Sequence, residues 1–326
     1  MKRIVLCTLG SLGDLHPILA LGAALRARGH AVAVATMNGY RPRVEALGLE
    51  FCPLGPHFDP EDAAVARLAA DVAQGSENIF RKLLMPFLKE SWEETLEAVD
   101  GADFVLSHPI TLGVPMAAEK TGFLWGSTVL SPLSLLSKND SWEFPGHPGV
   151  SAIYRAVPRL RGAIWAGGRI KTRRWIGPLL EFRKELGLKT DVHPLFEGQH
   201  SPHLVLALFS SVLTSPQPDW PANTIVTGFC YHDGTTMPPE LERFLDAGAP
   251  PLVFTLGSTA VHDAGDFYVE SAAAARSLGR RAVLLGAHGI EGPDLCTVPY
   301  APYSLLFPRA EAIVCSGGIG TVGPAL

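Results

Sequence analysis

The sequence predicts an α/β protein with two Rossmann-like domains facing a cleft, the second of them incomplete. Three observations predict this fold: a strand, glycine turn, helix and strand within residues 3–36, further alternation of strands and helices, and a restart of the same pattern after residue 250. Such alternation is typical of parallel sheets with helices on both faces. The length of 326 residues suggests about two domains.

The first 36 residues contain a complete βαβ unit. RIVLCTL (3–9) is a continuous apolar run, which is typical of a buried parallel strand. GSLGD (10–14) follows as a glycine turn, and residues 16–29 carry apolar side chains at helical spacing. HAVAVAT (30–36) is the next buried strand. We therefore expect two parallel strands joined by a right-handed helical crossover.

The alternation continues through the N-terminal domain, which we expect to span residues 1–228. Residues 97–109 read as a helix end and a strand, 113–122 as a helix, and 203–211 as a later strand. This domain is predicted to be a doubly wound sheet, so its ligands should lie beyond the carboxyl ends of the strands.

A change in amino-acid composition separates this domain from the next. Residues 229–250 are rich in proline, glycine and acidic side chains and hold one short amphipathic helix, and we interpret them as a linker. The pattern then restarts, with strand and turn at 251–258, a helix at 266–279, a strand at 280–286 and a last strand and turn at 310–320. A doubly wound domain usually has about six strands. Residues 251–326 supply roughly half of them, so a partial second domain is expected there.

Composition excludes several classes of protein. The net charge of −5 argues against a nucleic-acid partner. The five cysteines are scattered without paired spacing, as in a reduced cytoplasmic protein. The opening MKRIVLCTLGSLGD breaks its apolar run too early for a signal peptide, and no apolar run is long enough for a spanning helix. A cytoplasmic location is therefore expected.

Three glycine turns follow predicted strands and are candidates for anion binding. They are GSLGD (10–14), TLGST (255–259) and SGGIGT (316–321). Glycine lets the backbone approach a ligand closely, and a helix that begins behind the turn presents free N–H groups to an anion. Taken singly, each turn is better explained as a tight connection of the chain. Two such turns in the second half favour a diphosphate site in that half.

The motif of dinucleotide redox enzymes is missing. The first turn reads GSLGD instead of G-x-G-x-x-G, and ATMNGY (35–40) at the end of the second strand offers no carboxylate to a ribose. The hypothesis of an oxidoreductase therefore fails at both points that the motif requires.

Several segments resemble a known family. GSLGDLHPILALGAALRARGH resembles the opening of the GT-B glycosyltransferases of families 1 and 28, and VFTLGST and PRAEAIVCSGGIGTVGPAL are similar to their donor-domain motifs. The amino-acid sequence resembles even more closely the rhamnosyltransferases of rhamnolipid synthesis and their sterol-, flavonoid- and macrolide-modifying relatives. The resemblance extends from residue 1 to 326 and is weakest around 55–100 and 140–200. It implies the GT-B fold.

The resemblance also implies a reaction. A sugar would pass with inversion from a UDP- or TDP-linked donor to a hydroxyl of a small lipophilic or polyketide- or flavonoid-like acceptor, with neither a cofactor nor a metal. The acceptor hydroxyl must lose a proton as it attacks, so a general base is needed within hydrogen-bond reach. The departing diphosphate gains charge, so fixed hydrogen-bond donors must face it.

Asp14 is the candidate base on the acceptor side, in a loop that also holds Gly10, Ser11 and Gly13. Its alternative role is to cap the helix that begins there. His16 is an alternative base, because an ordinary histidine has a better-matched pKa. His108, after the strand ADFVLS, is expected to assist Asp14 or to line the acceptor pocket, with a solvated loop residue as the equal alternative.

The donor side is predicted from the two later turns. The residues expected to contact the diphosphate are Gly257, Ser258, Thr259, Ser316, Gly317, Gly318, Ile319, Gly320 and Thr321. Tyr300 falls where relatives hold the nucleotide base, with core packing as the alternative. Relatives carry histidine at the position of Cys315, and a thiol is a much weaker donor, which Ser316 would offset in part.

A basic segment spans residues 155–184 and has apolar residues interleaved. Its cations are Arg155, Arg159, Arg161, Arg169, Lys171, Arg173, Arg174, Arg183 and Lys184. A segment of this kind can lie on an anionic membrane face, and we expect peripheral contact with the inner face of the membrane if the acceptor is lipidic. The alternative is a solvated helix that packs its tryptophans inward.

The resemblance bears on the end of the chain as well. In relatives the last turn leads to an acidic-amide motif that binds the sugar hydroxyls, and then to a helix that returns to the first domain. Neither feature is found before Leu326. We therefore expect a C-terminally truncated chain that is inactive alone and prone to dimerise or aggregate. A second hypothesis is a catalytically weak acceptor-binding or interaction protein with a degenerate donor half.

Overall fold

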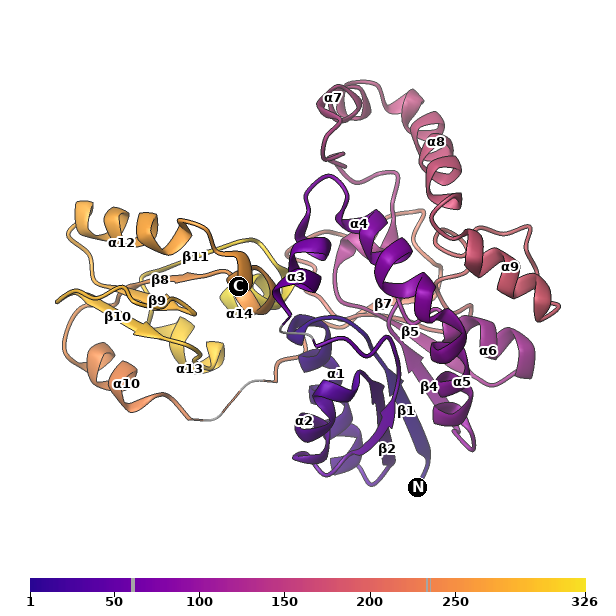
Figure 1. The fold of residues 1–326 in the computed structure, drawn as a ribbon, viewed down its shortest axis with the longest axis horizontal. Helices are drawn as coiled ribbons and strands as arrows, with labels where there is room; N and C mark the ends of the chain where they lie inside the picture. The colour runs from indigo at the N-terminus through magenta and orange to yellow at the C-terminus, as the bar shows by residue number, and fades with distance from the viewer. Residues whose placement is uncertain (60–61, 233, 235) are drawn as a thin grey trace. The chain divides into compact units, whose positions relative to one another are not determined.

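Two parallel β-sheets organise the computed structural model, which describes residues 1–59, 62–232, 234 and 236–326 (Figure 1). Contacts divide the chain into two compact units, one around each sheet. The first consists of residues 1–9, 18–59 and 68–230, and the described residues of 10–17, 60–67 and 231–326 are grouped in the second. In both units strands alternate with helices along the chain, so the predicted α/β class is confirmed.

The first sheet has seven strands in the order β3-β2-β1-β4-β5-β6-β7, and every neighbouring pair is parallel. Its strands are β1 (Arg3–Cys7), β2 (Ala31–Thr36), β3 (Glu50–Pro53), β4 (Phe104–Ser107), β5 (Trp125–Val129), β6 (Val205–Ala207) and β7 (Thr224–Val226). The order of the strands reverses between β1 and β4. Ligands of doubly wound sheets bind beyond the carboxyl ends of the strands at such a reversal.

Burial explains why the first strand is so apolar. Val5, Leu6 and Cys7 have no exposed surface, since β1 lies between two strands and is covered on both faces. The predicted strand, turn, helix and strand at residues 3–36 are confirmed by β1, helix α1 (Leu12–Ala27) and β2. The α-helices that follow β2 in the chain, up to residue 230, are α2 (Arg41–Glu45), α3 (Ala63–Ala70), α4 (Gly75–Asn78), α5 (Leu88–Val99), α6 (Gly113–Thr121), α7 (Pro148–Ala156), α8 (Arg161–Arg173) and α9 (Gly177–Glu185).

The second sheet has four parallel strands in the order β10-β9-β8-β11. They are β8 (Leu252–Thr255), β9 (Ala282–Leu285), β10 (Leu295–Val298) and β11 (Ala312–Cys315). This order reverses between β8 and β11, the two strands that precede the later glycine turns. The second sheet therefore repeats the winding of the first over its first four strands.

Helices cover both faces of the second sheet (Figure 1). The helices of this unit are α10 (Pro239–Asp246), α11 (Gly257–Ala260), α12 (Phe267–Ser277), α13 (Tyr303–Leu306) and α14 (Ile319–Ala325). Leu241 and Leu245 of α10 pack with Val253 of β8 and Val283 of β9 in one buried cluster. On the other face, the alanines of α12 pack with Phe254 in a second cluster. The amphipathic helix predicted within residues 229–250 is thus α10, and its apolar side lies in the core of the second unit.

The basic segment folds into α7, α8 and α9. Trp165 of α8 is buried and makes edge-on contacts with Trp142 and Phe196, with ring centroids 5.3 and 5.4 Å away. Several cations of this segment form ion pairs with acidic residues: Arg155 with Glu143, Arg169 with Glu197 and Arg183 with Glu119. The inward tryptophan and the paired charges agree with the solvated-helix alternative. No helix in the described part of the chain is long and apolar enough to cross a lipid bilayer.

Candidate active site

The first glycine turn begins α1 with a reciprocal hydrogen-bonded cap. The Oγ of Ser11 accepts a hydrogen bond from the backbone N–H of Gly13 at 3.3 Å. The carboxylate of Asp14 accepts from the backbone N–H of Ser11 at 2.8 Å and from its Oγ at 3.1 Å. This is the capping-box arrangement, in which the third helical residue reaches back to the capping residue. Ser11 is therefore the cap, and Asp14 is held in place by it.

Gly10 allows this close approach of the carboxylate. A Cβ built on Gly10 would lie 2.3 Å from Oδ2 of Asp14, far inside contact distance, and the backbone φ of +120° also disfavours any other residue. The sequence GSLGD thus has a local explanation. Gly10 leaves the space, Ser11 caps the helix, and the Asp14 carboxylate fills the space left by Gly10, after the carboxyl end of β1.

His108 lies on the other side of the strand-order reversal in the first sheet. It directly follows β4, and its backbone N–H donates to the carbonyl of Cys7 in β1 at 2.9 Å. The side chain is 8% exposed, so the alternative of a solvated loop histidine does not hold. Thr111 Oγ1 donates to the His108 carbonyl at 2.5 Å and fixes the loop. His108 and the Asp14 turn therefore follow the two strands that flank the reversal.

His16 takes a different direction from Asp14. It is half-buried on α1, two residues after Asp14. Residues two apart on a helix do not face each other.

The two glycine turns of the second unit lie next to each other. β8 and β11 pair in register, with Cys315 opposite Thr255, so the turns that follow them start at the same edge of the sheet. The Oγ of Ser316 donates to the backbone carbonyl of Leu256 at 3.1 Å and joins the turns directly. A Cβ on Gly257 would lie 3.3 Å from Oγ1 of Thr321, which is itself buried.

The surface above these turns is open. Gly317, Gly318 and Gly320 are exposed, and a Cβ on Gly317 or Gly318 would meet no atom within 4 Å. Ser258 and Ile319 are half-buried beside them. The side chain of Thr259 is outside the described part of the structure, although its backbone lies in α11. Backbone N–H groups around an open glycine turn are suited to an anion.

Cys315 ends β11 and is half-buried, so its thiol is neither fully in the core nor fully in solvent. It has the position that the sequence predicted, at the start of the last glycine turn. A thiol is a weak hydrogen-bond donor compared with an imidazole.

Tyr300 lies after β10 and is 48% exposed, so core packing does not explain it. The preceding Pro299 lines a hollow of about 460 Å³ in the second unit, which is formed mainly by the loop after β9, with His288 and Glu291 among its polar lining residues. Nothing in the sequence indicated this hollow, because its lining comes from a loop without a recognised motif.

Tyr303 is a further residue that the sequence did not single out. Its hydroxyl lies 3.3 Å from Oγ1 of Thr255 at the end of β8, and its ring stacks on Phe307 at 4.3 Å. An aromatic residue close to TLGST in space but 48 residues away in sequence carries no local signal.

Comparison with known proteins identifies the family. Residues 4–107 match the glycosyltransferase family 28 N-terminal domain. Over 99% of its length the chain is 33% identical to O-mycaminosyltylonolide 6-deoxyallosyltransferase of Streptomyces fradiae, of which it covers 78%. The chain belongs to the glycosyltransferases of the family 28 type. This glycosyltransferase is also 27% identical to a sterol 3-beta-glucosyltransferase of Arabidopsis thaliana, covering 99% of the chain and 55% of that relative.

Solved structures of glycosyltransferases share its fold. The glycotransferase of kitacinnamycin superposes with a TM-score of 0.66 at 18% identity, covering 99% of this chain and 77% of that one. The Streptomyces sp. SF2575 glycosyltransferase SsfS6, complexed with thymidine diphosphate, superposes with a TM-score of 0.58 at 20% identity, covering 99% of this chain and 79% of that one. The GT-B fold and the resemblance to this family, both expected from the sequence, are confirmed.

Proposed function

We propose that this glycosyltransferase moves a sugar, with inversion, from a nucleotide diphosphate donor to a hydroxyl of a small lipophilic acceptor. The observation that carries the proposal is the hydrogen bond from Ser316 to Leu256, by which two glycine turns form one open surface at the strand-order reversal of the second sheet. Reversals of this kind bind nucleotides in doubly wound folds.

The diphosphate is assigned to this surface. Backbone N–H groups of Gly317 and Gly318, with the hydroxyl of Ser258, would donate to its oxygens as negative charge develops there. The hydroxyl proton of Ser316 is used in the bond to Leu256, so Ser316 holds the two turns together instead. Thr321 is buried, and its Oγ1 lies 3.3 Å from the point where a Cβ on Gly257 would be. The nucleoside would extend toward Tyr300 and the hollow next to it. Thymidine diphosphate in SsfS6 supports a TDP-linked donor, with a UDP-linked donor as the second choice.

Asp14 is proposed as the general base. Its two hydrogen bonds from Ser11 orient the carboxylate, which would accept the proton of an acceptor hydroxyl as that hydroxyl attacks the sugar. His108, next to the same reversal, is proposed to orient the acceptor. The names of the Streptomyces fradiae and Arabidopsis thaliana relatives support a lipophilic hydroxyl compound as the acceptor.

The second hypothesis, a weak acceptor-binding protein, is favoured by one observation. Cys315 gives the last turn a thiol where relatives carry a strong donor. We also predict peripheral membrane contact through residues 155–184 and the formation of a dimer. For the membrane contact, the exposed side chains of Leu160 and Ile170 offer some support.

Calorimetric titration of the purified protein with TDP and UDP tests the proposal. Gly317→Ala puts a methyl group on the proposed diphosphate surface, and Gly279→Ala is its matched control. Both glycines have positive φ and open space around them, but Gly279 lies in the turn between α12 and β9. We expect Gly317→Ala to weaken TDP binding by roughly tenfold or more, a loss of about 1.4 kcal/mol. The control should keep the wild-type affinity.

Two results would decide against the proposed function. If Gly317→Ala and Gly279→Ala bind TDP with equal affinity, the glycine turns are not the diphosphate site. A folded wild-type protein that binds neither nucleotide would favour the acceptor-binding hypothesis. Inversion is checked separately, by the anomeric configuration of the product in proton NMR.

A further inference from the structure

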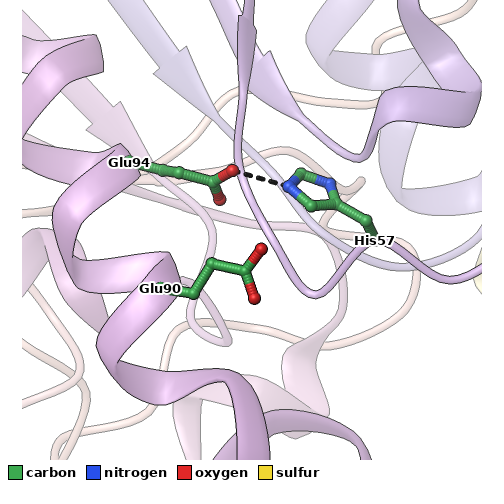
Figure 2. A group of neighbouring side chains, drawn as sticks. All are labelled: His57, Glu90 and Glu94. Atoms are coloured by element: carbon green, nitrogen blue, oxygen red, sulfur yellow. Dashed lines mark hydrogen bonds and ion pairs between the residues drawn. The ribbon is translucent and has the colours of Figure 1, made fainter.

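Three potential metal ligands converge in the first unit, outside the residues assigned to sugar transfer. His57 lies in the loop after β3, while Glu90 and Glu94 lie one turn apart on α5 (Figure 2). One nitrogen or oxygen atom from each of the three lies within 4.8 Å of the other two. Figure 2 shows both carboxylates extending from the helix toward the imidazole.

The two inner side chains are already held in position. Nε2 of His57 lies 2.6 Å from Oε1 of Glu94, and the side chains are only 20% and 16% exposed. Oε2 of Glu94 accepts a hydrogen bond from the backbone N–H of Gly55 at 2.5 Å. A Cβ on Gly55 would lie 3.2 Å from that oxygen, so the glycine gives the carboxylate room to approach the loop.

Glu90 is the third potential ligand and is the one exposed to solvent. It is exposed in the first turn of α5, and among the described residues its carboxylate forms neither a hydrogen bond nor an ion pair with another side chain. Two half-buried ligands and one exposed carboxylate leave further coordination positions open to water.

We propose that His57, Glu90 and Glu94 bind a divalent transition-metal ion of the Zn²⁺ class, which clamps the loop after β3 onto α5. An imidazole nitrogen with two carboxylates suits Zn²⁺, at about 2.0–2.2 Å from each ligand atom. Mg²⁺ and Ca²⁺ prefer oxygen ligands alone. Without the ion, Nε2–H of His57 donates to Glu94; the ion displaces that proton, which passes to solvent. The site departs from the expectation, drawn from the family resemblance, that no metal is bound.

The role assigned to the ion is structural. The ligands come from a loop and a helix that are 37 residues apart at the His57–Glu94 contact, so a shared ion closes a long segment of chain. A ligand that binds only the folded state raises its stability by mass action. Binding of Zn²⁺ should therefore raise the midpoint of thermal unfolding.

The test is calorimetric titration of the chelator-treated, dialysed protein with ZnCl₂, together with thermal unfolding. We expect Glu90→Gln to weaken Zn²⁺ affinity by about tenfold or more, as loss of a ligand should cost at least what loss of its supporting partner does. Glu93→Gln is the matched control, because Glu93 is also exposed on α5 but is not among the three ligands. It should bind Zn²⁺ like the wild type.

His57→Gln tests the nitrogen ligand, and visible absorption of the Co²⁺-substituted protein provides a spectroscopic readout. The Co²⁺ bands should be lost in His57→Gln and kept in Glu93→Gln. The proposal is overturned if the wild type binds no Zn²⁺ at roughly 100 μM, or if Glu90→Gln and Glu93→Gln have equal affinity. It is also overturned if Mg²⁺ binds at the site as tightly as Zn²⁺.

Discussion

The Oγ of Ser316 lies 3.1 Å from the carbonyl oxygen of Leu256 and donates a hydrogen bond to it. This bond links the turn after β11 to the turn after β8, which are 60 residues apart in sequence. The residue before Ser316 is the half-buried Cys315, so the bond also restrains the backbone at the position where relatives carry histidine.

The first prediction concerns Cys315. Cys315→His restores a strong hydrogen-bond donor next to the proposed diphosphate and should tighten TDP binding or raise kcat. Cys315→Ser is the control, because a short hydroxyl reaches less far than an imidazole. Nucleotide titration and a donor-consumption assay measure both effects. If Cys315→His changes neither affinity nor kcat, the side chain points into the core.

The second prediction concerns Asp14. Asp14→Asn keeps an oxygen that can accept from Ser11 but removes the basic charge. In a full-length form of the enzyme, kcat should therefore fall by roughly 10²–10⁴ while TDP affinity stays unchanged. Ser11→Ala is the comparison, since it removes the cap and leaves the base, at a cost of about 1 kcal/mol of stability. Near-normal turnover by Asp14→Asn would exclude Asp14 as the base.

The third prediction concerns Gly10. Gly10→Ala would place a methyl group 2.3 Å from Oδ2 of Asp14 and force the carboxylate away from Ser11. The strained backbone costs about 1–3 kcal/mol, and kcat should fall with it. Gly29→Ala, at another positive φ but with no atom within 4 Å, controls for backbone strain alone. Equal turnover in the two variants would show that the carboxylate position does not matter.

The fourth prediction concerns pH. Burial lowers the pKa of the His200 imidazole, and the hydrogen bond from Nε2 to the Ser134 carbonyl at 3.0 Å only partly opposes this. As pH falls below about 6.5, the unfolded chain takes up a proton that the native imidazole resists. The free energy of unfolding should therefore fall as pH drops through this window.

Urea unfolding at pH values about one unit above and one unit below the ordinary histidine pKa of about 6.5 measures the loss. His200→Gln keeps an N–H donor for Ser134 and removes the titrating group, so the difference in stability between the two pH values should shrink. An unchanged difference would assign the pH dependence to other groups.

Local patterns predicted the fold because its first strands are apolar enough to be unambiguous. β1 and β8 are buried strands that run into glycine turns, and both signals lie in consecutive residues. The pattern GSLGD also contained the capping box, with Ser11 and Asp14 three residues apart, although the sequence suggested Asp14 itself as the cap.

Other features depended on tertiary contacts that no local pattern encodes. Tyr303 reaches Thr255 only because α13 packs against the second sheet, whereas the sequence pointed to the nearby Tyr300. His57 meets Glu94 because a loop and a helix converge beside β3. The basic segment looked strongly cationic because its acidic partners, such as Glu119 and Glu197, lie outside it in the sequence.

The packing of α10 decides where this enzyme can be recombined with a relative. Leu241 and Leu245 belong to the same buried cluster as β8 and β9, so the helix is inseparable from the sheet that follows it. A chimera joined after Pro251 would supply a foreign helix to that cluster, and mismatched side chains there would leave voids or clashes. A crossover placed before Met237 transfers helix and sheet together. Exchange of the second unit of this chain should therefore begin upstream of α10.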